Sequence, residues 1–237
     1  AIQNGFIQII QDEKRDYQYE EAMKTLRTNI QFSGNGLKVI MLTSAMPDEG
    51  KSETSFQLAI SMAQTEGRVL FIDADIRKSV LVSRFGGGQQ IYGLTQYLTG
   101  QRPLGEVLYH TNLPNLDIIF SGPMAPNPAE LLGGKNFRSL LNALRKVYDY
   151  VIVDTPPLGS VIDSAIVAEI CDGSIMVIES GVISYRFAQE VKSQLERSNC
   201  PLLGVVLNKV DMQKQAYGKY GKYGQYKYGD YGQEEDD

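Results

Sequence analysis

Six short runs of β-branched and other apolar residues recur along this chain, and longer stretches rich in polar residues separate them. The runs cover residues 38–43, 69–72, 116–120, 150–153, 174–178 and 203–207. Short runs with almost no polar position are typical of parallel strands that are covered on both faces. Their alternation with helical stretches predicts an α/β fold, with a mostly parallel sheet flanked by helices.

Two of the intervening stretches carry clear helix signals. After residue 51, apolar residues recur at steps of three and four positions, as they do along one helix face. They are Phe56, Ala59, Ile60 and Ala63. A second helix is expected to begin near Asn127, where an asparagine N-cap precedes a proline in the first turn and a glutamate at the third position.

The two ends of the chain differ from this pattern. Residues 1–32 are expected to form an N-terminal helical arm, with a charged helix over 17–31, ahead of a main domain over 33–215. From residue 217 on there is no aliphatic residue, and glycine recurs at nearly every third position. Such a segment cannot bury a core, so the tail over 216–237 is expected to be disordered. Its tyrosines are Tyr217, Tyr220, Tyr223, Tyr226, Tyr228 and Tyr231.

Charge and composition exclude several classes of protein. The net charge of -5 gives no reason to expect nucleic acid or an anionic membrane surface as a partner. No apolar run approaches the ~20 residues that cross a bilayer, and no secretory signal opens the chain. Cys171 and Cys200 stand apart from any CxxC pair, which favours reduced thiols in a cytoplasmic protein over a metal site. The sequence begins with Ala1 rather than methionine, so it leaves an upstream membrane segment open.

The first apolar run leads into a sequence typical of a phosphate-binding loop. It reads Ser44-Ala45-Met46-Pro47-Asp48-Glu49-Gly50-Lys51-Ser52, and a helix is expected next. In such a loop the backbone N–H groups and the helix N-terminus bind phosphate, the lysine reaches the β- and γ-phosphates, and the serine ligates Mg²⁺. Ala45 stands where the usual pattern has its first glycine. A chance turn with a surface lysine is the alternative.

Three aspartates follow two of the predicted strands. Asp73 and Asp75 come directly after the run 69–72, and Asp154 follows the run 150–153. Ligands of α/β sheets bind at the carboxyl ends of the strands, and Mg²⁺ prefers oxygen ligands. Each aspartate taken alone could cap a helix. Together with Ser52 they favour a site for a magnesium nucleotide.

These motifs together resemble the cytoplasmic bacterial tyrosine kinases (BY-kinases) that control capsular and exopolysaccharide synthesis. The resemblance spans nearly the whole chain from Glu21 to the tail. It rests on the loop with its proline and glutamate before Gly-Lys-Ser, on a DxDxR sequence, on a DxxP sequence and on the tyrosine-rich tail; the residues are Pro47, Glu49, Gly50, Lys51, Ser52, Asp73, Asp75, Arg77, Asp154 and Pro157. It implies a P-loop kinase domain over 33–215 that uses ATP and Mg²⁺.

The resemblance assigns a role to each acidic residue of the predicted site. Asp75 and Asp154 are expected to hold Mg²⁺, directly or through water, together with Ser52. Asp73 is the candidate for engaging the tyrosine hydroxyl, because a phenol with a pKa near ~10 needs a proton acceptor as it attacks. Most of the acceleration is expected from positioning and from charge neutralisation by Lys51 and Mg²⁺.

An Asn-Lys-x-Asp sequence follows the last predicted strand. It begins at Asn208, which the resemblance places near the adenine as a nucleotide contact. Ordinary loop polarity is an equally good interpretation of Lys209 and Asp211.

The resemblance also implies assembly and partners. The family carries a Glu-x-x-Arg-x-x-Arg motif in its N-terminal helix, which packs subunits in a ring; the matching residues here are Glu21, Lys24 and Arg27. Lysine cannot form the bidentate fork of an arginine, and a solvated helix with i, i+3 charge pairs is the alternative. The expected partners are further copies of the chain, a membrane adaptor that recruits it to the inner face of the plasma membrane, and a phosphotyrosine phosphatase.

The function expected from these features is autophosphorylation of the tail tyrosines in trans, which regulates polysaccharide synthesis and export. The main rival is a related P-loop ATPase that positions DNA or the cell-division site. Those proteins carry an extra lysine in the loop, where this chain has Met46, and they lack a tyrosine-rich tail. A non-enzymatic adaptor is a second rival, against which the intact lysine and aspartates speak.

Overall fold

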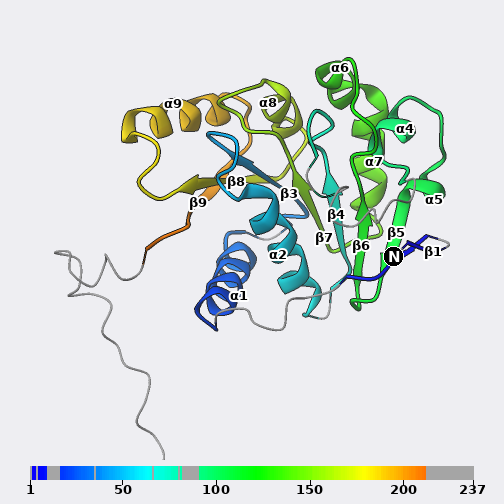
Figure 1. Cartoon of the computed structure of the whole chain (residues 1–237), viewed down its shortest axis with the longest axis horizontal. Helices are drawn as coiled ribbons and strands as arrows, with labels where there is room; N and C mark the ends of the chain where they lie inside the picture. Colours follow the sequence, from blue (N-terminus) through cyan, green and yellow to red (C-terminus); the bar gives the residue numbers. More distant parts are fainter. Residues whose placement is uncertain are drawn as a thin grey trace, which may run out of the picture.

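The computed structural model of this 237-residue chain describes residues 2–3, 5–9, 17–34, 36–65, 67–79, 81 and 91–211. Within these residues, a nine-stranded sheet lies between two layers of helices (Figure 1). The strand order is β1-β2-β5-β6-β4-β7-β3-β8-β9. The tail over 216–237, with the six tyrosines predicted as phosphorylation sites, lies outside the described residues.

Six neighbouring strands of the sheet run parallel, and they are the six predicted from the apolar runs. In chain order they are β3 (Val39–Ser44), β4 (Val69–Asp73), β6 (Leu116–Ile119), β7 (Tyr150–Asp154), β8 (Gly173–Glu179) and β9 (Leu202–Asn208). Every residue of β3 and β4 is buried, as expected for strands covered on both faces. The prediction of a mostly parallel α/β sheet is confirmed.

Alternate residues of each central strand pack into opposite layers. In β3, Val39 and Met41 belong to one core cluster, whereas Ile40 and Leu42 belong to the other. The first cluster includes α7 (Lys135–Leu144), α8 (Asp163–Ala168) and α9 (Tyr185–Glu196), and the second includes α1 (Tyr17–Phe32) and α2 (Lys51–Ala63). The predicted helix after residue 51 is α2, which lies between the sheet and α1 (Figure 1).

The N-terminal segment contains more than the expected helix. Helix α1 is present where a charged helix was expected, but β1 (Ile2–Gln3) and β2 (Phe6–Ile7) precede it. Strand β2 extends the sheet by pairing with β5 (Leu108–Thr111). The described parts of the expected helical arm over 1–32 therefore pack onto the main domain.

Short elements complete the helical layer that contains α7, α8 and α9. They are α4 (Leu94–Leu98), α5 (Leu104–Val107) and α6 (Pro128–Gly133). Helix α6 begins as predicted, with Asn127 at the N-cap and a proline in the first turn. The Asn127 side chain makes no capping hydrogen bond and instead donates to Glu130 Oε2 at 2.7 Å.

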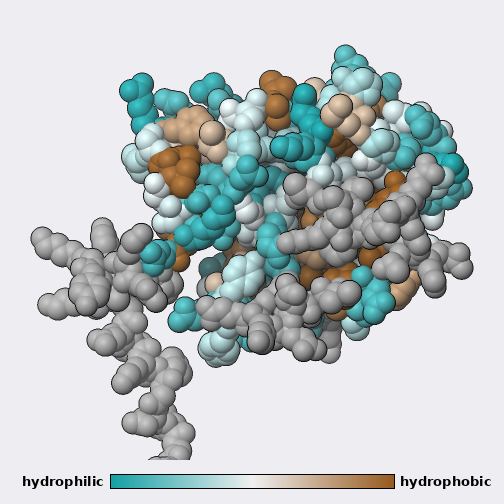
Figure 2. Space-filling model, in the orientation of Figure 1, coloured by the Kyte–Doolittle hydropathy of each residue, from teal (hydrophilic) through white to brown (hydrophobic). Residues whose placement is uncertain are grey.

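The face shown in Figure 2 mixes hydrophilic and hydrophobic residues wherever grey atoms do not cover it. Exposed apolar side chains include Met124 and Ile162, which lie outside helices and strands, and Tyr185, the first residue of α9. Among the described helices, none is long and apolar enough to cross a membrane.

Candidate functional site

The loop between β3 and α2 has the backbone of an anion-binding turn. Asp48 and Gly50 both have positive φ, 65° and 83°. Glycine suits that conformation because it has no Cβ to collide with the backbone. A Cβ on Gly50 would also lie 2.1 Å from Asn208 Nδ2, so the neighbouring strand end excludes any larger residue there.

Helix α2 presents an uncapped N-terminus at this loop. Its N-cap, Gly50, offers no side-chain acceptor, and the first main-chain bond of the helix runs from Thr54 N to Gly50 O at 3.0 Å. The N–H groups of the first helical turn thus lack intrahelical partners, and the helix dipole adds partial positive charge. Together these features form a cradle for a phosphate group.

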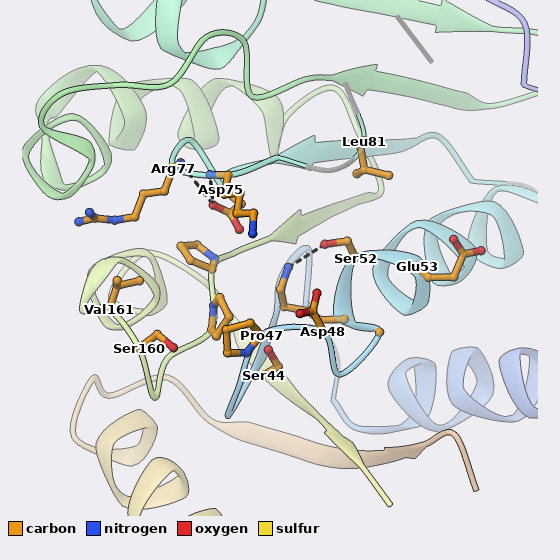
Figure 3. A pocket seen from close by; sticks show the side chains of 15 residues that line it. Ser44, Pro47, Asp48, Ser52, Glu53, Asp75, Arg77, Leu81, Ser160 and Val161 are labelled. Atoms are coloured by element: carbon orange, nitrogen blue, oxygen red, sulfur yellow. Dashed lines mark hydrogen bonds between the residues drawn. The ribbon is translucent and has the colours of Figure 1, made fainter. Parts of the chain in front are cut away.

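The cradle opens into a cavity of about 540 Å³ (Figure 3). This volume is in the range of small-molecule pockets, ~300–1,000 Å³. Its walls come from the phosphate loop, from the segment after β4 and from the segment after β7. The lining residues are Ser44, Pro47, Asp48, Gly50, Lys51, Ser52, Glu53, Asp75, Arg77, Lys78, Leu81, Pro156, Pro157, Ser160 and Val161.

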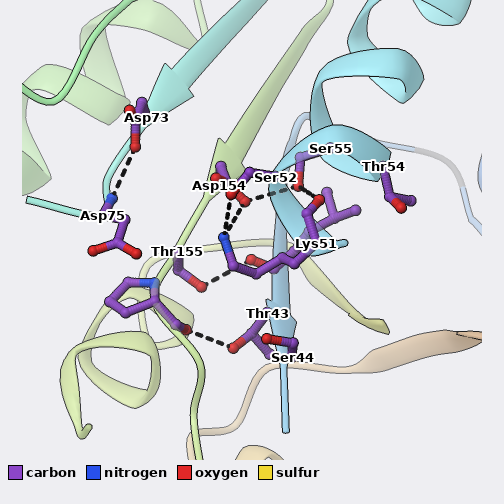
Figure 4. A network of polar contacts seen from close by, with 12 residues as sticks. Thr43, Ser44, Lys51, Ser52, Thr54, Ser55, Asp73, Asp75, Asp154 and Thr155 are labelled. Carbon is purple, nitrogen blue, oxygen red and sulfur yellow. Dashed lines mark hydrogen bonds and ion pairs between the residues drawn. The ribbon is translucent and has the colours of Figure 1, made fainter. Parts of the chain in front are cut away.

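Lys51, which lines the cavity, forms a buried ion pair with Asp154 (Figure 4). Lys51 Nζ lies 2.5 Å from Asp154 Oδ1 and 3.0 Å from Ser52 Oγ. Ser55 Oγ, one turn further along α2, donates to the same carboxylate oxygen at 2.9 Å. The side chains of Lys51 and Asp154 are only 6% and 1% exposed, so this pair lies in a region of low dielectric, where charges interact strongly.

Asp73 ends the neighbouring strand β4 and lies in register with Asp154. Its carboxylate accepts from Ser79 Oγ at 2.5 Å and from the Asp75 backbone N–H at 3.2 Å. Burial, with a further contribution from the Asp154 charge, raises the pKa of Asp73 to about 7. A carboxyl group of that pKa can accept or release a proton near neutral pH.

Of the three aspartates predicted to follow the strands, Asp75 is the one that lines the cavity (Figure 3). Its side chain accepts from the backbone N–H groups of Arg77 and Lys78 at 3.3 and 3.0 Å, and burial raises its pKa. Arg77 forms a two-pronged ion pair with Asp163, at 2.5 and 3.0 Å, which fixes the segment after β4 against α8.

These residues fit a magnesium nucleotide, although they do not supply a complete set of metal ligands by themselves. Within the described residues, no three His, Cys, Asp or Glu side chains lie close enough to hold a metal ion. Mg²⁺ usually takes one or two carboxylates and completes its shell with waters and substrate phosphates. Ser52, Asp75 and Asp154, next to a phosphate cradle, are a donor set of that kind.

Two further residues predicted to bind nucleotide, Glu49 and Asn208, hold the loop in place through hydrogen bonds. Glu49 is 1% exposed, and its carboxylate accepts from the N–H groups of Met46 and Glu179 at 2.7 and 3.2 Å. Asn208 Nδ2 donates to the Glu49 carbonyl at 2.9 Å, and Asn208 is not among the residues that line the cavity. Its predicted contact with the adenine stays a prediction.

Several polar residues of the site were not identified from the sequence. Ser55 lies one helical turn after Lys51, and this spacing could have indicated it. Ser79 comes from an irregular segment and Asp163 from the first turn of α8, and the local pattern does not define the path of the chain to either. Lys209, interpreted as ordinary loop polarity, donates to the Asp48 carbonyl at 2.7 Å.

The residues predicted for the subunit interface lie on α1. Lys24 pairs with Glu21 at 2.7 Å, and both side chains are nearly half exposed, as in the alternative of a solvated charge pair. Arg27 Nη1 donates to the Ser61 carbonyl of α2 at 2.7 Å, within the same chain. An interface role for these residues stays a prediction.

The fold and this loop define a P-loop nucleotide-binding protein, and residues 37–197 match the AAA domain family. The tyrosine-protein kinase CpsD of Streptococcus agalactiae serotype III is 44% identical over 199 residues, which cover 84% of this chain and 86% of that protein. The kinase domain of Escherichia coli tyrosine kinase ETK has a TM-score of 0.75 and 30% identity, with 86% of this chain and 91% of that domain covered. The chain therefore belongs to the bacterial tyrosine-protein kinases.

The fold alone is also shared with the septum site-determining protein MinD of Pyrococcus horikoshii in complex with Mg-ADP. There the identity is 19% and the TM-score 0.61, over 72% of this chain and 69% of that one. The fold is thus common to both classes that the sequence suggested, whereas the extensive sequence identity lies with the kinases.

Proposed function

We propose that this chain transfers the γ-phosphoryl group of ATP to the tyrosines of its C-terminal tail, acting on a neighbouring copy, and that it thereby regulates capsular or exopolysaccharide synthesis and export. The observation that carries the proposal is the convergence of the uncapped α2 N-terminus, Lys51 and Asp75 at one cavity, with Asp154 paired to Lys51 and Asp73 in register beside it. The kinase relatives supply the reaction class.

The phosphates fit the cradle of the loop. Backbone N–H groups at the start of α2 are suited to bind phosphate oxygens, and Ser52 offers a hydroxyl at the same place. Lys51 is the first residue of α2, and its flexible side chain would let the ammonium group reach the β- and γ-phosphates. Mg²⁺, held by Ser52, Asp75 and Asp154, would neutralise charge on the phosphate oxygens.

Asp73 is suited to take the proton of the acceptor. As the tyrosine oxygen bonds to the γ-phosphorus and the bond to the β-phosphate oxygen breaks, the phenolic proton passes to the Asp73 carboxylate and ADP leaves. The raised pKa of Asp73 supports this role, because a base with a pKa near the operating pH is an efficient acceptor.

The tail holds six of the fourteen tyrosines of this chain, so it is rich in possible acceptors. The expected partners are other copies of the chain, a membrane adaptor that recruits it to the inner face of the plasma membrane, and a phosphatase that resets it. Each phosphate adds about -1.5 to -2 charges, so a phosphorylated tail should leave an acidic site.

The test is transfer between two defective copies. One copy carries Lys51→Met and keeps its tail, and the other is active but has all six tail tyrosines replaced by Phe. With ATP and Mg²⁺, phosphotyrosine should appear on the inactive copy at a rate that rises with concentration. Labelling only of an intact copy, at a rate independent of concentration, would contradict transfer in trans. If no copy became labelled, the proposal that the chain is a tyrosine kinase acting on its tail would be wrong.

A further inference from the structure

The carboxyl end of β9 is attached to the back of the phosphate loop through two consecutive residues. Asn208 Nδ2 donates to the carbonyl of Glu49, and Lys209 Nζ donates to the carbonyl of Asp48. The two acceptors are also consecutive, and they belong to the two peptide groups that lead into Gly50. The roles expected from the sequence, a base contact for Asn208 and plain loop polarity for Lys209, do not account for this pairing.

A trans peptide is planar, with its C=O and N–H pointing to opposite sides. Holding the Asp48 carbonyl therefore directs the Glu49 N–H the other way, and holding the Glu49 carbonyl does the same for the Gly50 N–H. Neither N–H has a hydrogen-bond acceptor among the described residues. Both carbonyls are held from the β9 side, so the two N–H groups point away from β9. Asp48 and Gly50 line the cavity, whereas Asn208 and Lys209 do not.

Neighbouring contacts hold the two donors in place. Lys209 Nζ also pairs with Glu179 Oε2 at 2.8 Å, and Glu179 lies in register with Asn208 on the adjacent strand β8. The Glu179 N–H in turn donates to the Glu49 carboxylate. Asn208 comes so close to the loop that a Cβ on Gly50 would lie 2.1 Å from its Nδ2. Both strands thus contribute to one rigid contact with the loop.

We infer that Asn208 and Lys209 are positioning residues that set the direction of the loop N–H groups and thereby preorganise the phosphate cradle. The inference rests on the proposed function, since it concerns how the same site binds the phosphates of ATP. Its distinctive consequence is that the two residues act on phosphate binding in general and not on recognition of the base.

Four variants separate this role from others. Asn208→Asp keeps the shape but sets an acceptor against the Glu49 carbonyl. Lys209→Met removes the donor and Lys209→Arg restores one. Lys192→Met removes a lysine from an exposed lysine–glutamate pair on α9 and serves as the matched control. Thermal unfolding is recorded for each variant, and Lys209, with a side chain 46% exposed, can be replaced at little risk to the fold.

Binding of Mg-ATP and of inorganic tripolyphosphate is measured by calorimetry for each protein. Asn208→Asp and Lys209→Met should each weaken both ligands by the same factor, about 3- to 10-fold, as expected for one hydrogen bond. Lys209→Arg should recover most of the affinity, and Lys192→Met should change nothing.

The alternatives give different patterns. Weaker ATP binding with unchanged tripolyphosphate binding in Asn208→Asp would make that residue a base contact and overturn the inference. Unchanged affinity for both ligands in Lys209→Met would do the same. If the unaltered protein bound neither ligand, the proposed function itself would be wrong, which distinguishes that failure from a failure of the role inferred for Asn208 and Lys209.

Discussion

The buried pair of Lys51 and Asp154 should make the nucleotide-binding lysine important for stability as well as for activity. Lys51→Met keeps the apolar stem but leaves the Asp154 carboxylate, 1% exposed, with Ser55 as its remaining partner. Removing one member of a buried ion pair typically costs ~3–5 kcal/mol. The Ser55 hydrogen bond compensates in part, so the loss should be about 3 kcal/mol, which lowers Tm by roughly 6–12 °C in a chain of this size.

A double-mutant cycle in the nucleotide-free protein tests this estimate. Urea unfolding is followed by circular dichroism for Lys51→Met, Asp154→Asn and the double variant, with Lys192→Met as a surface control. The double variant has no unpaired charge, so it should be more stable than Lys51→Met alone by about 1–3 kcal/mol. If Lys51→Met unfolds at the same urea concentration as the unaltered protein, and the two changes add within ~0.5 kcal/mol, the pair contributes no stability and the reasoning is refuted.

Two further substitutions test the neighbouring residues. Asp73→Asn should lose phosphoryl transfer far more than ATP affinity, and equal losses would make Asp73 a plain metal ligand. Because the folded-state pKa of Asp73 is raised from 3.8 to about 7, the unaltered protein loses stability as pH rises through that range. The free energy of unfolding of Asp73→Asn, relative to that of the unaltered protein, should therefore be higher at pH 8 than at pH 5. The reverse order would contradict the raised pKa of Asp73. Gly50→Ala should lower the free energy of unfolding by about 1–2 kcal/mol, because residue 50 has a positive φ, and it should weaken ATP binding. Adding Asn208→Ala removes the nearby side chain, so the double variant should regain part of the lost stability. A Gly50→Ala protein as stable as the unaltered one would show that the loop has room for a Cβ.

The central sheet could be predicted from the sequence because its strands are buried on both faces. Burial on both sides turns each strand into an apolar run, and all six parallel strands were found in this way. Strands β1, β2 and β5 lie on the side of the sheet away from β9. They are short, and in β2 and β5 buried residues alternate with more exposed ones. His110 and Thr111 in β5 carry no signal that separates a short strand from a loop.

The candidate site could be predicted where function depends on local sequence. The phosphate loop and the aspartates after β4 and β7 are each contiguous with a strand, so the sheet brings them to one edge. The contacts that hold these parts in place connect residues far apart in the chain. Asn208 and Glu49 are 159 positions apart, and Arg77 and Asp163 are 86 apart. Their pairing depends on the three-dimensional path of the chain.

The position of β9 at the edge of the described sheet affects how firmly the nucleotide is held. β3, from which the loop emerges, is bonded on both sides, whereas β9 is bonded to β8 alone, and Val205 and Leu207 are about half exposed. Edge strands open locally at a lower free energy than the centre of a sheet. Brief fraying of β9 would release the Asp48 and Glu49 carbonyls while the core stays folded. Amide hydrogen exchange in this strand and nucleotide affinity therefore depend on the same local opening equilibrium, and a bound nucleotide should slow exchange there.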